Sequence, residues 1–80
     1  MPPDAKTWID EWFKARNPDG SLGPNENFVD KGVVDSFGIV ELIEQVEAAF
    51  HIRFTDDDFQ RTEMMTQAGL TAIVSEKLTR

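Results

Sequence analysis

The sequence predicts an all-α fold, a small four-helix bundle of three longer helices and one short helix, with a long loop between helices one and two. Three observations support this. Apolar residues recur at helical spacing in three stretches, turn-forming residues separate those stretches, and no alternating strand pattern competes. Because 80 residues with 40% hydrophobic content suffice for one small core, we expect a single domain over residues 1–80.

The first helix is expected over residues 4–16, where apolar residues follow the i, i+3, i+4, i+7, i+8 pattern of one buried stripe. Asp4 can cap its start. Asn17-Pro18 ends it, because the residue before a proline is disfavoured in the α region. The stripe comprises Ala5, Trp8, Ile9, Trp12 and Phe13.

Residues 17–34 carry the turn signals Pro18-Asp19-Gly20 and Gly23-Pro24 without sustained periodicity, which indicates a loop. A loop this long in a compact domain needs an anchor. We expect four apolar side chains to supply it: Phe28, Val29, Val33 and Val34.

Part of this loop resembles a calcium-binding EF-hand loop, with Asn17, Asp19, Gly20 and Glu26 at similar offsets. Ala15 occupies the first ligand position, which should be acidic, and prolines interrupt the loop. We therefore expect an ordinary turn and no metal site.

The second helix is expected over residues 35–50, the short helix over 56–60 and the last helix over 66–78. Thr55 before three aspartates is typical of a cap followed by an acidic first turn, and Thr66 can cap the last helix. The apolar positions are Ile39, Leu42, Ile43, Val46 and Phe50, then Leu70, Ile73, Val74 and Leu78.

The outward face of the second helix mixes apolar and acidic residues. At about 100° per residue from Ile39, this face spans about 80° to 200°. Such a surface suits docking onto a basic partner, although an ordinary solvated face with scattered apolar residues remains an alternative. The face comprises Phe37, Val40, Glu41, Glu44, Glu47 and Ala48.

Ser36 is expected at the start of this helix, where backbone N–H groups lack intrahelical partners and the helix dipole favours anions. A phosphate ester on its hydroxyl would be well placed there. The alternative is that Asp35 or Ser36 only caps the helix. His51, with no nucleophile at suitable spacing, is expected at the surface or a helix end.

The formal net charge of −7 disfavours nucleic acid and anionic membrane surfaces as partners and favours basic protein surfaces. With no cysteine, any thiol chemistry must come from an attached group. No apolar stretch approaches the length of a bilayer span, so we expect no membrane insertion and a cytoplasmic, monomeric protein.

The run from Gly32 to Phe50, containing Asp35-Ser36, resembles the core motif of acyl carrier proteins and the related aminoacyl and peptidyl carrier domains. The segment from Phe50 to Asp58 and the pair Met65-Thr66 extend the resemblance over residues 29–78. Val33-Val34 and Phe37 are closer to specialised carriers and D-alanyl carriers than to the central fatty-acid carrier.

This resemblance implies that Ser36 receives 4′-phosphopantetheine from coenzyme A, through a phosphopantetheinyl transferase that uses magnesium. Asp35 would cap the helix and help to position that metal. The arm's thiol would carry an acyl or aminoacyl thioester to enzymes of fatty-acid, polyketide, peptide or related biosynthesis, after a loading ligase has charged it. The protein itself would be non-catalytic. The implied partner-recognition residues are Phe37, Val40, Glu41, Glu44 and Glu47.

Two positions depart from the pattern. Gly38 stands where fatty-acid carriers are often acidic, and Glu44 where they are often apolar. Two other hypotheses remain open: an acidic helical adaptor without a prosthetic group, and a small calcium-responsive protein.

Overall fold

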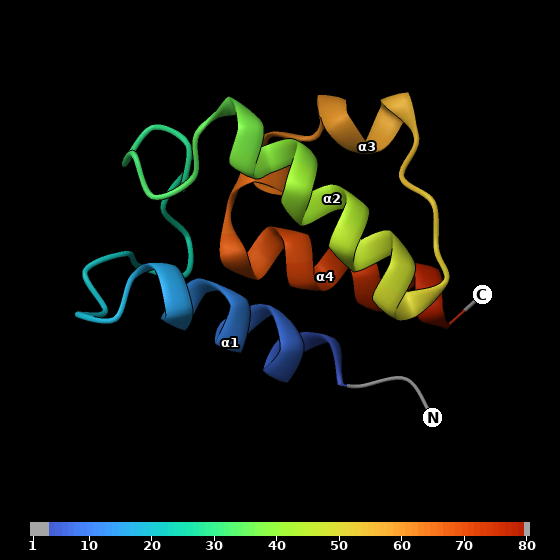
Figure 1. The fold of residues 1–80 in the computed structure, drawn as a ribbon. Helices are drawn as coiled ribbons and strands as arrows, with labels where there is room; N and C mark the ends of the chain where they lie inside the picture. The colour runs from blue at the N-terminus through green and yellow to red at the C-terminus, as the bar shows by residue number, and fades with distance from the viewer. Residues whose placement is uncertain (1–3, 80) are drawn as a thin grey trace.

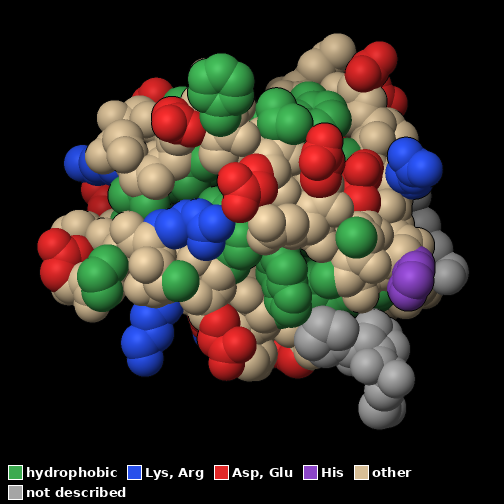
Figure 2. Space-filling view, in the orientation of Figure 1, with side chains coloured by type: hydrophobic (Ala, Val, Ile, Leu, Met, Phe, Trp, Pro, Cys, Tyr) green, Lys and Arg blue, Asp and Glu red, His purple; other side chains and the backbone are tan. Residues whose placement is uncertain are grey.

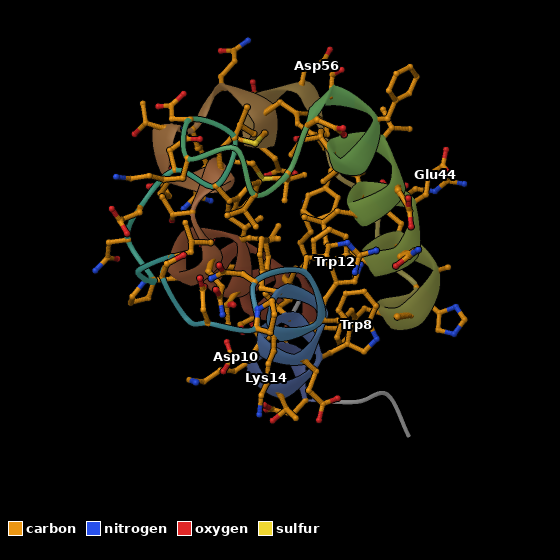
Figure 3. All side chains as sticks on the ribbon, turned by 60° about the vertical axis from the view of Figure 1, so that its left-hand side comes forward. Trp8, Asp10, Trp12, Lys14, Glu44 and Asp56 are labelled. Atoms are coloured by element: carbon orange, nitrogen blue, oxygen red, sulfur yellow. The ribbon has the colours of Figure 1, made fainter. Side chains whose placement is uncertain are left out.

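The computed structural model describes residues 4–79. In these residues the only β-pairing is an isolated bridge between Asn27 and Thr66, so the all-α prediction is confirmed. Figure 1 shows the start of α1 and the end of α4 on the same side, and Figure 3 shows α1, α2 and α4 arranged around a common core. The elements are α1 (Ala5–Arg16), α2 (Ser36–Phe50), α3 (Asp56–Gln60), the 3₁₀ turn η1 (Thr62–Met65) and α4 (Gln67–Leu78).

Each of the three longer helices begins directly after a residue whose side chain accepts the backbone N–H three residues later. Asp4 accepts from Thr7, Asp35 from Gly38 and Thr66 from Gly69, at 3.0, 2.7 and 2.9 Å. Such a cap contributes about 1 kcal/mol to the helix. Each helix therefore starts one residue after its predicted first residue, because the cap lies outside the helix.

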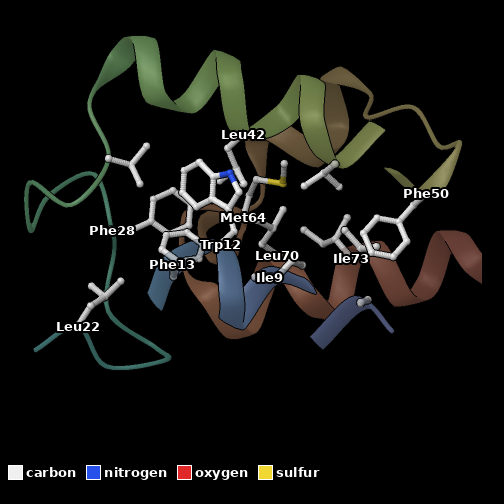
Figure 4. Packing of buried hydrophobic residues seen from close by; sticks show 14 residues of the cluster. Ile9, Trp12, Phe13, Leu22, Phe28, Leu42, Phe50, Met64, Leu70 and Ile73 are labelled. Atoms are coloured by element: carbon white, nitrogen blue, oxygen red, sulfur yellow. The ribbon is translucent and has the colours of Figure 1, made fainter. Parts of the chain in front are cut away.

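One hydrophobic core joins α1, α2, α4, η1 and the loop (Figure 4). The Trp8 and Phe50 rings meet edge to face with centroids 5.8 Å apart, which connects α1 to the end of α2. Leu78, expected in the core, is 38% exposed because α4 ends there. The largest fully buried side chains are Ile9, Phe28, Leu42, Val46, Met64, Leu70, Ile73 and Val74.

The long loop is fixed to the start of α4 by backbone hydrogen bonds. Phe28 N donates to Met65 O and Ala68 N donates to Pro24 O, both at 2.9 Å. The predicted anchoring by Phe28 and Val34 is confirmed, and Val33 is half-buried against the core. Leu22, which was not predicted to be buried, is only 8% exposed.

The prediction that Val29 anchors this loop is wrong, because its side chain is 39% exposed. Its backbone N–H is held by Asn27 Oδ1 at 2.9 Å in a tight turn. Val29 therefore lies in a turn at the surface, while its neighbour Phe28 enters the core.

Short helix α3 contributes no buried residue. It is tied to α4 by an ion pair between Asp58 and Lys77 at 2.7 Å, whose side chains are only 13% and 11% exposed. The Lys77 ammonium also lies 5.7 Å from the ring centroid of Phe54. In the part of the chain that the structure describes, no helix is long and apolar enough to cross a bilayer.

Candidate functional site

Ser36 is the first residue of the 15-residue helix α2, and it is exposed. Asp35 directly before it caps the helix by accepting the Gly38 N–H, so the prediction that Asp35 can cap this helix is confirmed. The N–H groups of Ser36 and Phe37 belong to the first turn, where no intrahelical acceptor is available. The positive end of the helix dipole lies at the same place. A phosphate ester on the Ser36 hydroxyl fits this environment, because it would meet free donors and would not displace a packed side chain.

The backbone leading to Ser36 is held in place by the loop. Val33 N and Val34 N both donate to Phe28 O, at 3.0 and 3.1 Å. Gly32, two residues before Val34, has φ +75°, a left-handed conformation that suits glycine. The side chain of Val34 is 3% exposed and packs in the core. The candidate serine is therefore exposed on a backbone that the core fixes.

The outward face of α2 carries large apolar side chains in contact with solvent. Phe37 is 84% exposed and Val40 is 55% exposed. Figure 2 shows exposed apolar groups alternating with carboxylates across this face. The sequence-based expectation of apolar residues on an acidic, solvent-facing surface is thus confirmed as a description of the surface.

The three carboxylates of this face have different surroundings. Glu41 Oε1 is 3.3 Å from Arg16 Nη2 and accepts a 3.1 Å hydrogen bond from Gln45 Nε2. Glu47 Oε2 accepts the backbone N–H of Phe54 at 2.9 Å, which fixes the connection from α2 to α3. Glu44 is exposed and points away from the core in Figure 3. The helical period predicts that the three carboxylates share one face, but it does not indicate which of them form bonds to residues outside α2.

Two open hollows border this face. One, of about 440 Å³, lies at the end of α2 and is lined in part by His51. His51 is exposed at the helix end, as expected, and its backbone is left-handed there. The other, of about 280 Å³, lies between the end of α1 and the start of α2 and is lined by Asp35 and Gly38 among others. A Cβ at position 38 would lie 2.9 Å from Val34 Cγ1, so a side chain there would force the buried Val34 side chain to shift.

Residues 11–66, more than half of the chain, match the family described as "Phosphopantetheine attachment site". The matched region includes the exposed serine, its cap and the whole of α2. The chain belongs to this family of phosphopantetheine-binding carrier proteins, as the resemblance indicated. Its cofactor is 4′-phosphopantetheine, covalently attached to the domain.

Among curated proteins, the chain is similar to D-alanyl carrier proteins of Streptococcus thermophilus, from strains ATCC BAA-491 / LMD-9, CNRZ 1066 and ATCC BAA-250 / LMG 18311. Each is 38% identical over 68 residues, which cover 85% of this chain and 82% of the relative. No solved structure matches.

Proposed function

We propose that Ser36 is the residue that carries 4′-phosphopantetheine, and that the arm's thiol holds an acyl or aminoacyl group as a thioester. The observation that carries the proposal is the exposed hydroxyl at the first residue of α2, inside the region that matches the family. The four helices would serve as the bundle that supports this arm. Carrier proteins of this kind are generally non-catalytic, and the chemistry is performed by the enzymes that they visit.

We propose an aminoacyl cargo, with D-alanine as the first candidate. The name of the similar streptococcal proteins, D-alanyl carrier protein, supports it. Glu44 also supports a specialised carrier, because an acidic residue there departs from the fatty-acid carriers. The corresponding partners are a phosphopantetheinyl transferase, a ligase that loads the thiol and a downstream acceptor enzyme.

The outward face of α2 is the proposed docking surface for these partners. It combines the exposed side chains of Phe37 and Val40 with an acidic surround, next to the serine. A basic partner gains diffusional steering from the −7 net charge and contact energy from the apolar pair. Asp35 would help the transferase to position its magnesium ion.

The attachment is tested by incubating the protein with coenzyme A, magnesium and a promiscuous phosphopantetheinyl transferase, and then measuring intact mass. We expect a gain of one phosphopantetheine in the wild type and in Ser75→Ala, which removes an exposed serine on α4. We expect no gain in Ser36→Ala. A gain that survives Ser36→Ala, or none in the wild type, refutes the assignment, and the second result would favour the acidic adaptor.

The cargo is tested on the modified protein with ATP, a D-alanine-activating ligase and, in parallel, a fatty-acyl-activating ligase. We expect an additional mass of one D-alanyl group that is released by hydroxylamine, as a thioester should be. Loading by the fatty-acyl ligase alone would refute the aminoacyl proposal while leaving the attachment site intact.

A further inference from the structure

Arg16, at the end of α1, reaches across to the outward face of α2 and is held there by three contacts. Its Cζ lies 3.6 Å from the centroid of the Trp12 ring, and its Nη1 donates to Trp12 O at 3.3 Å. Its Nη2 lies 3.3 Å from Glu41 Oε1. Because an aromatic face attracts a guanidinium, the stacking favours the conformation that meets Glu41.

The carboxylate of Glu41 is fixed from the other side as well. Gln45 Nε2 donates to Glu41 Oε1 at 3.1 Å, and Gln45 Oε1 accepts from Trp12 Nε1 at 2.8 Å. Figure 3 shows the Trp12 side chain directed from α1 toward α2. The four side chains thus form a closed network between the two helices, and Glu41 cannot turn toward a partner without breaking it.

We infer that Arg16 is a specificity-determining residue, which neutralises Glu41 and leaves Glu44 as the main outward carboxylate of the docking surface beside Phe37 and Val40. This inference rests on the proposed function and names the partner's chemistry. The fitting partner is a protein with an apolar pocket that carries one basic side chain at its rim. A partner with several basic groups would be repelled by the Arg16 cation, which lies beside Glu41 on the face that the helical period predicts to be acidic.

The physical reason is the range of the interaction. A lone carboxylate attracts an approaching cation through its full charge. A carboxylate and a guanidinium 3.3 Å apart together form a dipole, whose field decreases faster with distance than that of a single charge. Glu47 is different, because its partner is the neutral N–H of Phe54 and its charge remains. Its carboxylate is nevertheless turned toward the connection between α2 and α3.

The test measures kcat/KM for phosphopantetheine transfer to this protein at several salt concentrations. Arg16→Gln should raise kcat/KM by about two- to fivefold at low salt, through the charge released on Glu41, and the gain should vanish at high salt. Arg16→Lys should behave nearly as the wild type. Lys14→Gln removes the same charge from the same helix, but Lys14 lines a hollow with Phe13 and Gln67 on another side, so its effect should be smaller.

The second arm of the test uses Glu41. Glu41→Gln should lower kcat/KM at low salt in the wild type, because it leaves the Arg16 cation unpaired, and it should return the Arg16→Gln variant to about the wild-type value. Glu44→Gln should lower kcat/KM in both backgrounds. No gain from Arg16→Gln, or a gain that persists when Glu41→Gln is added to it, overturns the inference while the mass gain at Ser36 still upholds the proposed function. Absence of any mass gain in the wild type refutes both.

Discussion

Replacing Lys77 by methionine tests how α3 is held to the rest of the protein. The substitution removes the ion pair with Asp58 while keeping a long apolar side chain near the Phe54 ring. Exposed ion pairs contribute up to about 1 kcal/mol, whereas breaking a fully buried pair costs about 3–5 kcal/mol. With side chains 11% and 13% exposed, and with Thr55 N still donating to Asp58, we expect a loss of about 2 kcal/mol at pH 7.

The loss should depend on pH. Partial burial raises the pKa of Asp58, but the hydrogen bonds from Lys77 and from the Thr55 backbone outweigh it and hold the pKa below its ordinary value of 3.8. A carboxylate whose pKa is lower in the folded state stabilises that state above its unfolded pKa, and this stabilisation is lost as pH falls through the folded pKa. The difference between wild type and Lys77→Met should therefore be complete at pH 7 and shrink below about pH 4.

The assay is urea unfolding followed by circular dichroism from pH 7 to pH 2.5. Lys6→Met is the control, because it breaks the Lys6–Asp10 pair, which is similarly short at 2.6 Å but much more exposed. We expect this control to change the free energy of unfolding far less than Lys77→Met. An equal loss in both variants, or a loss for Lys77→Met that is the same at pH 7 and pH 2.5, would refute the reasoning.

Substitutions at three further positions test the core and the site. Phe28→Ala should lower the free energy of unfolding by about 3–5 kcal/mol in urea melts, because its 1% exposed ring anchors the loop, and an unchanged midpoint would contradict this. Gly69→Ala should cost about 1–3 kcal/mol in the same assay, because a Cβ there would collide with the backbone of Glu63, and Ala68→Gly is the neighbouring control. Asp35→Ala should lower the free energy of unfolding by about 1 kcal/mol through the lost cap. Asp35→Asn keeps an accepting oxygen and should retain most of that stability, but the transferase should modify it more slowly than the wild type if the carboxylate positions the metal.

The helix starts could be predicted from the sequence because each depends on a local signal. Asp35, Thr55 and Thr66 cap helices through bonds to backbone N–H groups only three residues away, so their effect needs no knowledge of the rest of the chain. The exposure of Phe37 and Val40 followed in the same way from the period of one helix. The all-α class and the position of Ser36 at a helix start rest on such signals.

Contacts between distant parts of the chain could not be predicted. The pairing of Arg16 with Glu41 depends on where α1 ends relative to α2, which no periodicity specifies. Val29, expected as an anchor, is exposed and Leu22, for which nothing was predicted, is buried, because the backbone turns of the loop decide which side chain enters the core. The 3₁₀ turn η1, which buries Met64, was missed because four residues are too few to show a period.

The anchoring of the loop before Ser36 has a consequence for delivery. Since Val33 and Val34 are hydrogen-bonded to Phe28, and Phe28 to Met65, the root of a flexible tether would stay still while its far end explores the surroundings. The distance from the docked enzyme to the attachment point would then be constant, and only rotations within the tether would bring the cargo into each enzyme's catalytic pocket. A stationary root keeps the local concentration of cargo at each pocket set by tether length alone.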